Sequence, residues 1–230
     1  MEQPAIIVCV ILGAPIAFWI LIACAGAAPV FTFHKVKLRQ LPDASTRRML
    51  KRAFTGNRRL NSEWPRENGF VPVGAFQASG LLGSPQIIAW EIPDEATWLC
   101  IYLLPDGQCQ FDFVSKTENH LLTSGTTKDG HLFPPSDGNY VQTFEVSSAE
   151  QLFTNHNAAL DFIAETTGED VVAQEGEFAE AFENSIRQHG THIRSMAFWI
   201  LRIPWWYFTR RSKLHNKSVE SIHGAAASSF

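Results

Sequence analysis

The sequence predicts an α+β fold: one N-terminal transmembrane helix followed by an antiparallel sheet of about six strands with C-terminal helices packed on it. An uncharged apolar stretch opens the chain, and short β-rich runs separated by turn residues precede two helical patterns. Consecutive strands with short turns favour antiparallel pairing, with the helices on one side of the sheet. With 230 residues and 45% hydrophobic side chains, the chain suits one such domain with its own core.

The apolar stretch covers residues 3–33 and contains no charged side chain. A bilayer core of about 30 Å needs about 20 helical residues at about 1.5 Å each, and Ala5 to Ala28 meets that length. Pro15 is expected to kink the helix and Pro29 to end it. We therefore interpret residues 1–33 as a transmembrane helix.

Basic residues follow this helix almost at once. Glu2 alone precedes it, whereas Lys35, Lys37 and Arg39 begin a run of nine cations and one acid within residues 34–59, which form a basic juxtamembrane segment. Lys and Arg close to the end of a span stay on the cytoplasmic side. The sequence predicts a single-pass protein of the cell membrane, with its N-terminus outside and its domain in the cytoplasm.

A cleaved signal is the alternative interpretation of this helix. Leu21-Ile22-Ala23-Cys24 resembles the lipobox of bacterial lipoproteins, whose cysteine becomes the lipidated N-terminus. A secretory signal begins with positive charge and has an apolar stretch of about 7–15 residues, and this chain matches neither feature. An uncleaved anchor is therefore preferred to an exported lipoprotein anchored at Cys24.

Six strands are predicted from β-rich runs broken at Gly, Pro and Asp clusters, at residues 69–77, 85–92, 97–104, 108–114, 120–127 and 140–146. A short basic helix, Arg47 to Phe54, comes before them. A capping box, Ser147 with Glu150 or Ser148 with Gln151, begins a helix that reaches about Glu165. A second helix is expected from about Glu177 to Ile193.

Two cysteines fall in one predicted hairpin around Asp106-Gly107, a dipeptide favoured in two-residue turns. Such a turn places Cys100 opposite Phe113 and puts Cys109 on the same face, about 13 Å from Cys100 at about 3.3 Å per residue. That separation exceeds disulfide reach. We expect both thiols to be free, which suits the cytosol.

Charge divides the chain into zones. Residues 60–186 hold 20 acidic side chains against Arg66, Lys116 and Lys128, whereas both flanking zones are basic. Phosphate binding needs a basic face, so nucleic acid is excluded as the main partner. The predicted order after the juxtamembrane segment is an acidic α+β domain at 60–193, a basic aromatic interfacial segment at 194–217 and a flexible tail at 218–230.

The interfacial segment contains a run of 13 residues from Met196 to Phe208, interrupted by Arg202 and Pro204, which is too short to span a bilayer. Aromatic side chains flanked by cations settle at the headgroup level. The residues predicted to contact the membrane interface and its anionic lipid headgroups are Trp199, Trp205, Trp206, Tyr207, Arg210 and Arg211. The alternative is a final helix packed on the domain's own core.

Ser124, Asp129 and His131 form a candidate catalytic set, because they include the types needed for nucleophile, orienter and base. The plain interpretation is a strand that runs into a turn at Lys128-Asp129-Gly130. No Gly-rich phosphate loop, nucleophile elbow or zinc-spaced cysteine pair occurs, and no cofactor is expected.

His189 and His192 are candidate metal ligands, because residues at i and i+3 share a helix face. Glu183 or His156 would supply a third ligand. His156 lies on an apolar helix face, where a hydrogen-bonded core histidine is the default.

The order FDFVS, LLTSGTT and PPSD before Tyr140, then a helix with Leu152, His156 and Ala159-Leu160, resembles membrane-anchored bacterial proteins of the planctomycete kind. The resemblance covers roughly residues 69–165 and implies no activity or catalytic residue. The sequence thus predicts a membrane-anchored domain that serves as a binding or interaction module for a protein or small ligand. A membrane-bound hydrolase or metal-dependent enzyme is the alternative.

Overall fold

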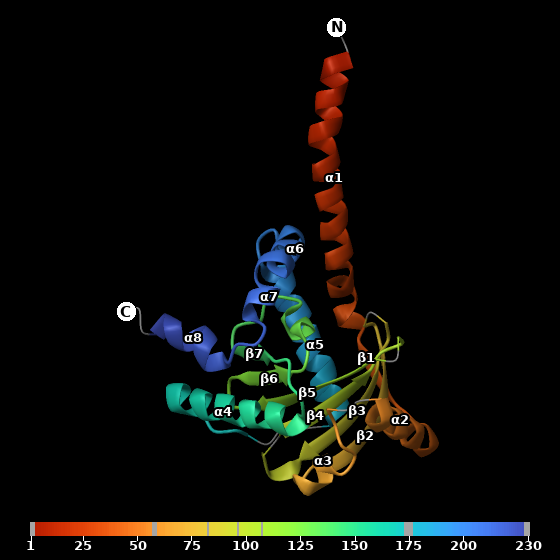
Figure 1. Ribbon diagram of the computed structural model, residues 1–230, viewed down its shortest axis with the longest axis vertical. Coiled ribbons are helices and arrows are strands. Elements are labelled where there is room, and N and C mark those ends of the chain that lie inside the picture. The colour runs from red at the N-terminus through yellow and green to blue at the C-terminus, as the bar shows by residue number, and fades with distance from the viewer. Residues whose placement is uncertain are drawn as a thin grey trace.

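The computed structural model of the chain describes residues 3–56, 59–81, 83–95, 97–106, 108–172 and 177–227, and in the first helix it describes side chains only at Ala14 and from Ala17 onward. Within these residues a seven-stranded sheet forms the middle layer, and helices cover both of its faces (Figure 1). The helix α1 (Gln3–Thr32) extends away from this body as a long rod. The α+β class and the N-terminal apolar helix predicted from the sequence are confirmed.

The strands follow one another across the sheet in chain order: β1 (Lys37–Gln40), β2 (Val71–Ser79), β3 (Gln86–Ile92), β4 (Thr97–Leu103), β5 (Cys109–Lys116), β6 (Leu121–Gly125) and β7 (Asn139–Thr143). Neighbours from β1 to β6 are antiparallel, as expected, whereas β7 runs parallel to β6. A parallel neighbour requires a crossover connection. Residues 126–138 supply it and contain the 3-10 turn η3 (Lys128–His131).

Strand β1 was not expected from the sequence, because its four residues are mostly polar and exposed. It forms one edge of the sheet and pairs with β2. The Glu183 carboxylate accepts a hydrogen bond from the Leu38 backbone N–H and pairs with the Lys37 ammonium, both at 2.8 Å. Short, charged edge strands are protected against further pairing. Part of the predicted juxtamembrane segment is therefore an integral strand of the domain.

Helices lie on both faces of the sheet, and not on one as predicted. On one face lie α2 (Asp43–Gly56), α3 (Trp64–Glu67) and α4 (Ala149–Thr167), and on the other lies α5 (Phe178–Ser195). Phe178 packs between Phe76 and Trp98, with ring centroids 5.3 and 5.1 Å away. The apolar run of β4 explains this arrangement, because a strand without alternation needs cover on both sides.

The predicted helices are present. The helix α4 begins after Ser148, whose side chain accepts a hydrogen bond from the Gln151 backbone N–H, so the second of the two predicted capping boxes forms. It ends before Gly168, which adopts a left-handed conformation at φ 74°. The helices α2 and α5 contain or match the predicted ranges, and α1 continues through Pro29 to Thr32.

The register between β4 and β5 corrects the predicted hairpin. Cys109 pairs with Leu103 and Cys100 pairs with Asp112, so the strands are shifted by one residue from the two-residue turn. Gly107 of that turn lies outside the described residues. Because a shift of one residue moves a side chain to the opposite face, the two thiols lie on different faces. No disulfide joins them, as predicted.

The C-terminal residues continue as α6 (Trp199–Thr209), α7 (Arg211–Leu214) and α8 (Val219–Ala227). A flexible tail was expected from residue 218, but Val219 is fully buried against Leu122 and Ile163. Its backbone N–H also donates to the Gln142 side-chain oxygen at 3.1 Å. The apolar docking of α8 on α4 gives these residues a fixed place up to 227.

Gly190 of α5 provides a test of this packing, because a Cβ there would lie 2.8 Å from the Cβ of Phe33. We expect Gly190→Ala to lower the free energy of unfolding by about 1–3 kcal/mol through overpacking, although Ala is the better helix former. Gly224→Ala in α8 is the control, since the nearest atom would be 3.8 Å away. Thermal unfolding of the detergent-solubilised chain measures both, and equal melting temperatures would contradict the close approach.

Candidate functional site

The end of α1 packs against α5 and α6. Ala23, Ala27 and Val30 follow one another at helical spacing and are buried. A Cβ on Gly26 would lie 3.3 Å from a methyl group of Ile203 in α6. Small residues let two helices approach closely in this way. The last third of α1 is therefore part of the folded body.

Among the described side chains of the preceding part of α1, Phe18, Ile20 and Leu21 are more than half exposed, and Ala23 is the first that is fully buried. Residues 3–22 of a helix span about 30 Å, which equals the hydrocarbon thickness of a bilayer. Within the described residues, the stretch Ala17–Lys35 is long and apolar enough to cross a membrane, a test that a signal sequence near the N-terminus also passes.

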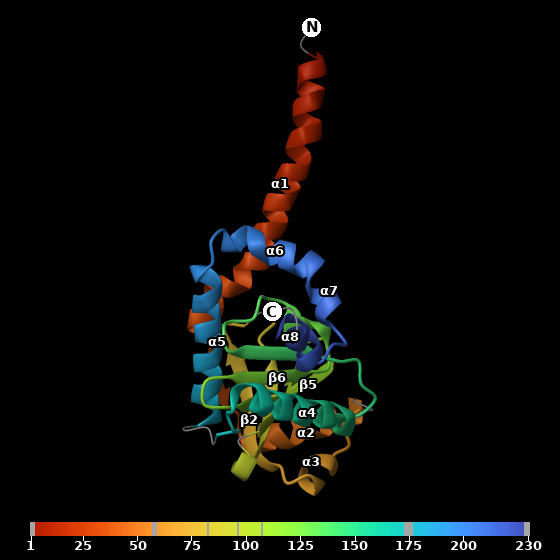
Figure 2. The same ribbon diagram turned by 90° about the vertical axis from the view of Figure 1, so that its left-hand side faces the viewer.

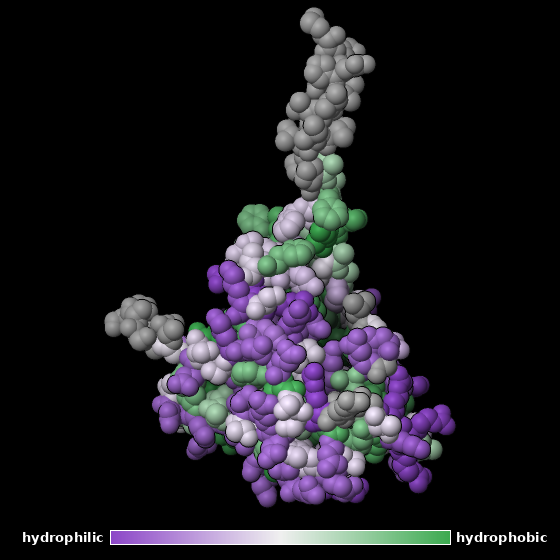
Figure 3. Space-filling model, in the orientation of Figure 1, coloured by the Kyte–Doolittle hydropathy of each residue, from purple (hydrophilic) through white to green (hydrophobic). Residues whose placement is uncertain are grey.

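An aromatic collar surrounds the place where α1 leaves the body. It consists of Trp19 and Phe31 of α1 with Phe198, Trp199, Trp205, Tyr207 and Phe208 in and next to α6. The ring of Trp19 lies 6.1 Å from that of Phe208, and the ring of Phe31 lies 5.1 Å from that of Trp199. Figure 2 shows α6 crossing above the domain beside α1, and Figure 3 shows apolar surface gathered there.

The two arginines that the sequence predicts at the membrane interface, Arg210 and Arg211, follow the collar and differ in their contacts. Arg210 is exposed, with its guanidinium 5.6 Å from the centre of the Trp205 ring. Arg211 instead forms an ion pair with Asp129 and donates to the Lys128 carbonyl at 3.2 Å. Arg210 is thus available for ligands from outside, whereas Arg211 attaches α7 to η3.

The two neighbouring tryptophans of α6 also face different surroundings. Trp205 is 45% exposed on the outer side of the helix. Trp206 is half-buried, and its indole N–H donates to the His131 carbonyl at 2.9 Å. Ile203 and Pro204 are buried on the same inner side. One side of α6 therefore packs on the body while the other is exposed and aromatic.

The structure does not bring the candidate catalytic residues together. Ser124 is buried on the α4 face of β6, where it bonds to His156 and Gln142 at 2.8 Å. Asp129 lies beyond the other face, paired with Arg211. His131 is buried, and desolvation lowers its pKa to about 4. Alternation along β6 separates Ser124 from the other two.

A buried hydrogen-bond chain accounts for Ser124. Thr97 and Ser115 hydroxyls lie 2.6 Å apart, and His156 bridges Ser115 and Ser124 with 2.8 Å on each side. Burial lowers the pKa of His156 to about 3, so the ring stays neutral. The expectation of a hydrogen-bonded core histidine is confirmed. This series of hydrogen bonds connects β4, β5, β6 and α4 inside the core.

The predicted metal ligands lie apart from their proposed third partner. The His189 ring lies 6.5 Å from Phe33 and 6.3 Å from Phe133, and burial lowers its pKa to about 4. Glu183 is occupied by β1 and His156 by the hydrogen-bond chain. Among the described residues, no group of three or more His, Cys, Asp or Glu is placed to hold a metal ion.

Asp112 is a titratable site that the sequence analysis missed. Alternation with the apolar Phe111 and Phe113 favours a solvent-exposed Asp112, but α5 and η3 lie on that side of the sheet. Asp112 lines a cavity of about 210 Å³ together with Tyr102 and Asp129. Its Oδ1 is buried without a hydrogen-bond partner in the described part of the chain, and burial raises its pKa to about 7. The sequence feature that could have indicated this site is the acidic residue between Phe111 and Phe113, two core positions of the same strand.

No family model, curated protein or solved structure matches this chain. The collar and the cavities are therefore interpreted from their own geometry.

We expect different results when Trp205 and Trp206 are each replaced by Phe in the full chain and the variants are reconstituted in vesicles with brominated lipids. We expect Trp205→Phe to reduce the quenchable fluorescence without abolishing it, because bromine on lipid reaches only indoles in the membrane and Trp19 and Trp199 of the collar remain. Trp206→Phe should leave quenching unchanged and lower stability by about 1 kcal/mol, the worth of its lost hydrogen bond. Equal quenching in both variants would contradict an interfacial α6.

Asp112 predicts a pH-dependent stability difference. Its pKa is higher in the folded chain (about 7) than at its ordinary value of 3.8, so stability falls as pH rises through this window. Asn does not titrate, so the stabilising effect of Asp112→Asn should grow from near zero at low pH to at most about 4 kcal/mol above pH 7. Urea unfolding across this pH range measures it, and a constant difference would contradict the raised pKa.

Proposed function

We propose that this chain is a single-pass membrane protein that holds its α+β domain at the cytoplasmic face as a binding or interaction module. The helix α1 crosses the bilayer through residues 3–22, and α6 lies in the interface of the leaflet from which α1 emerges. The domain is thus attached by two elements far apart in the sequence.

The observation that carries this proposal is the exposed aromatic side of α6 beside the exit of α1. Phe198 is 84% exposed and Phe208 58% exposed, with Trp205 between them along the chain. Large apolar patches of this kind on a soluble protein mark contact with a partner or a membrane. Trp and Tyr favour the headgroup region, where the ring is partly dehydrated and the polar tip stays wet.

Charge supports the orientation and the lipid preference. Lys35, Lys37 and Arg39 are exposed just beyond the end of α1, as expected for the cytoplasmic side. Arg202 and Arg210 are exposed on or directly after α6. Cations at an anionic leaflet add about 1 kcal/mol each, so anionic lipid headgroups are the expected partners of the collar.

A binding role fits the domain better than hydrolysis. Ser124 is enclosed in the core and does not share a cavity with Asp129. A nucleophile needs access to substrate and a base within hydrogen-bond reach on the same side. A cavity of about 510 Å³ instead has mixed charged and apolar walls, which suit recognition.

A second candidate is an exported lipoprotein anchored at Cys24. The Cys24 thiol is exposed on α1, next to the buried Ala23. Cleavage before Cys24 would remove the uncovered part of α1 and leave the part that packs on α5 and α6. In that case the lipid on Cys24 and the collar would together hold the domain on the outside.

Intact mass and topology reporters distinguish the two candidates. The single-pass form predicts an uncleaved N-terminus, with activity of a cytoplasmic reporter and not of an exported one fused after Phe230. Cys24→Ser should then leave membrane attachment unchanged. A mature chain that begins with acylated Cys24, lost in the Ser variant, would establish the lipoprotein form.

A further inference from the structure

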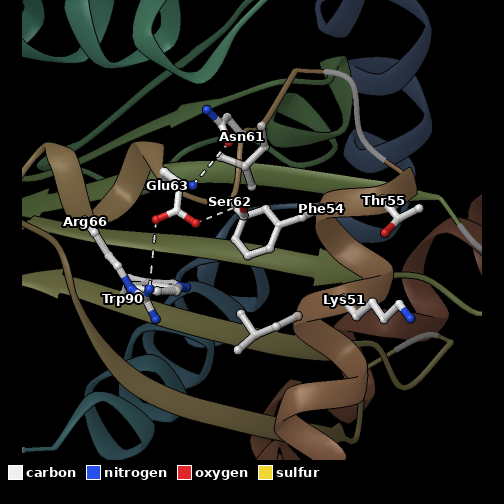
Figure 4. A pocket seen from close by; sticks show the side chains of 10 residues that line it. Lys51, Phe54, Thr55, Asn61, Ser62, Glu63, Arg66 and Trp90 are labelled. Carbon is white, nitrogen blue, oxygen red and sulfur yellow. Dashed lines mark hydrogen bonds and ion pairs between the residues drawn. The ribbon is translucent and has the colours of Figure 1, made fainter.

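A cavity of about 510 Å³ lies on the α2 and α3 face of the sheet, on the side of the body remote from the free end of α1 (Figure 1). Its size falls within the usual range of about 300–1,000 Å³ for small-molecule sites. Figure 4 shows the lining side chains, which come from α2, from the segment leading into α3 and from β3. This cavity is separate from both the aromatic collar and the Asp112 cavity.

The floor of the cavity contains Trp90, which is only 2% exposed. Its indole Nε1 has no hydrogen-bond partner among the described residues. In Figure 4 the nitrogen is at the edge of the ring nearest the centre of the lining side chains. Buried donors in native proteins are nearly always paired, so an unpaired one at a cavity indicates a missing acceptor.

Positive charge gathers at the mouth of this cavity. Lys51 from α2 and Arg66 from α3 both line it, and Arg66 has only a long contact of 4.0 Å with Glu63. Lys51 extends outward at the rim in Figure 4, and its flexible stem can turn inward. Within the described residues, neither Lys51 nor the exposed Arg52 beside it forms an ion pair. Glu63 also lines the cavity, so two cations stand against one anion there, and a cleft with net positive charge attracts anions.

The remaining walls are partly apolar, with Thr55, Asn61, Ser62 and Glu63 as the other polar lining residues. Leu50, Phe54 and Leu60 line the cavity around the Trp90 ring. An inorganic anion would leave these walls uncovered, whereas a ligand with an apolar body would bury them and keep its charge at the mouth. Aromatic side chains favour a flat partner because offset and edge-to-face ring contacts add to the burial.

We propose that this cavity binds a small organic oxyanion, with a planar apolar body against Trp90 and a carboxylate or phosphate held by Arg66 and Lys51. An acceptor on the ligand takes the hydrogen bond from Trp90 Nε1. The inference names the ligand class of the binding module proposed above, and it depends on neither the orientation of α1 nor the membrane contact of α6.

The test uses the full chain in nanodiscs of zwitterionic lipid, labelled at the tryptophan indole nitrogen for NMR. Trp90→Phe assigns the Trp90 signal, and the other indole signals report that the fold is intact. Phenyl phosphate and benzoate should shift the Trp90 signal saturably. Benzyl alcohol, which lacks the charge, and inorganic phosphate, which lacks the ring, should leave it unchanged at the same concentrations.

Two arginine variants provide the matched comparison. Arg66→Gln should weaken phenyl phosphate binding about tenfold or more, the loss expected for a charge-assisted hydrogen bond. Arg52→Gln removes the same charge from an exposed position of α2 that does not line the cavity, and binding should stay within about twofold.

Three outcomes would overturn the proposal. The first is a Trp90 signal that stays unshifted up to about 10 mM of either aromatic anion, a range that covers the weakest specific binding. The second is equal affinity in the Arg66 and Arg52 variants. The third is tighter binding of an acidic peptide than of either small ligand. Because attachment is measured separately by topology and lipid quenching, a failure here leaves the membrane proposal intact.

Discussion

The close packing of α1 on α5 and α6 is the contact on which the arrangement of the molecule depends. Ala27, Val30 and Phe33 share one buried cluster with Ile193 and Ile203. Gly190 accommodates Phe33 at a distance that a Cβ would not permit without a shift, and Gly26 accommodates Ile203 at a distance that a Cβ would make tight. Because packed cores resist deformation, this contact fixes the direction of α1 relative to the sheet. The helix α6 therefore lies at the end of the body from which α1 emerges, and α2 and α3 lie toward the opposite end (Figures 1 and 2).

The sheet holds the other elements in fixed positions relative to α1, because both of its faces and both of its edges are covered. Glu183 of α5 bonds to the backbone of β1 at one edge. At the other edge, the Asn216 backbone N–H donates to the Thr143 carbonyl at 2.7 Å. Arg211 at the start of α7 connects to Asp129 of η3, and Trp206 of α6 donates to the His131 carbonyl. The helix α6 is thus held to the η3 region by polar contacts and to α1 by apolar contacts.

Sequence patterns identified most elements, and their failures have physical causes. Long apolar or amphipathic stretches such as α1, α4 and α5 were predicted because their periodicity extends over many residues. The strand β1 was missed because four mostly polar residues carry no apolar alternation. The hairpin register was wrong because it depended on a single turn dipeptide. The burial of Asp112 was missed because alternation along one strand does not reveal whether the second face is also covered.

The positions of the basic residues were even harder to predict from the sequence, because folding separates residues that are close in the sequence and brings distant ones together. Cations that follow α1 in the sequence were expected to stay at the membrane, and the first of them do lie just beyond its end. The later ones belong to α2, which folds to the far side of the body, where Lys51 reaches the mouth of the larger cavity. The cations next to α6 return from the other end of the chain to the side where α1 emerges. Two basic segments in an otherwise acidic chain therefore lie in different places, one beside the exit of α1 and one beside a cavity, and only the fold distinguishes them.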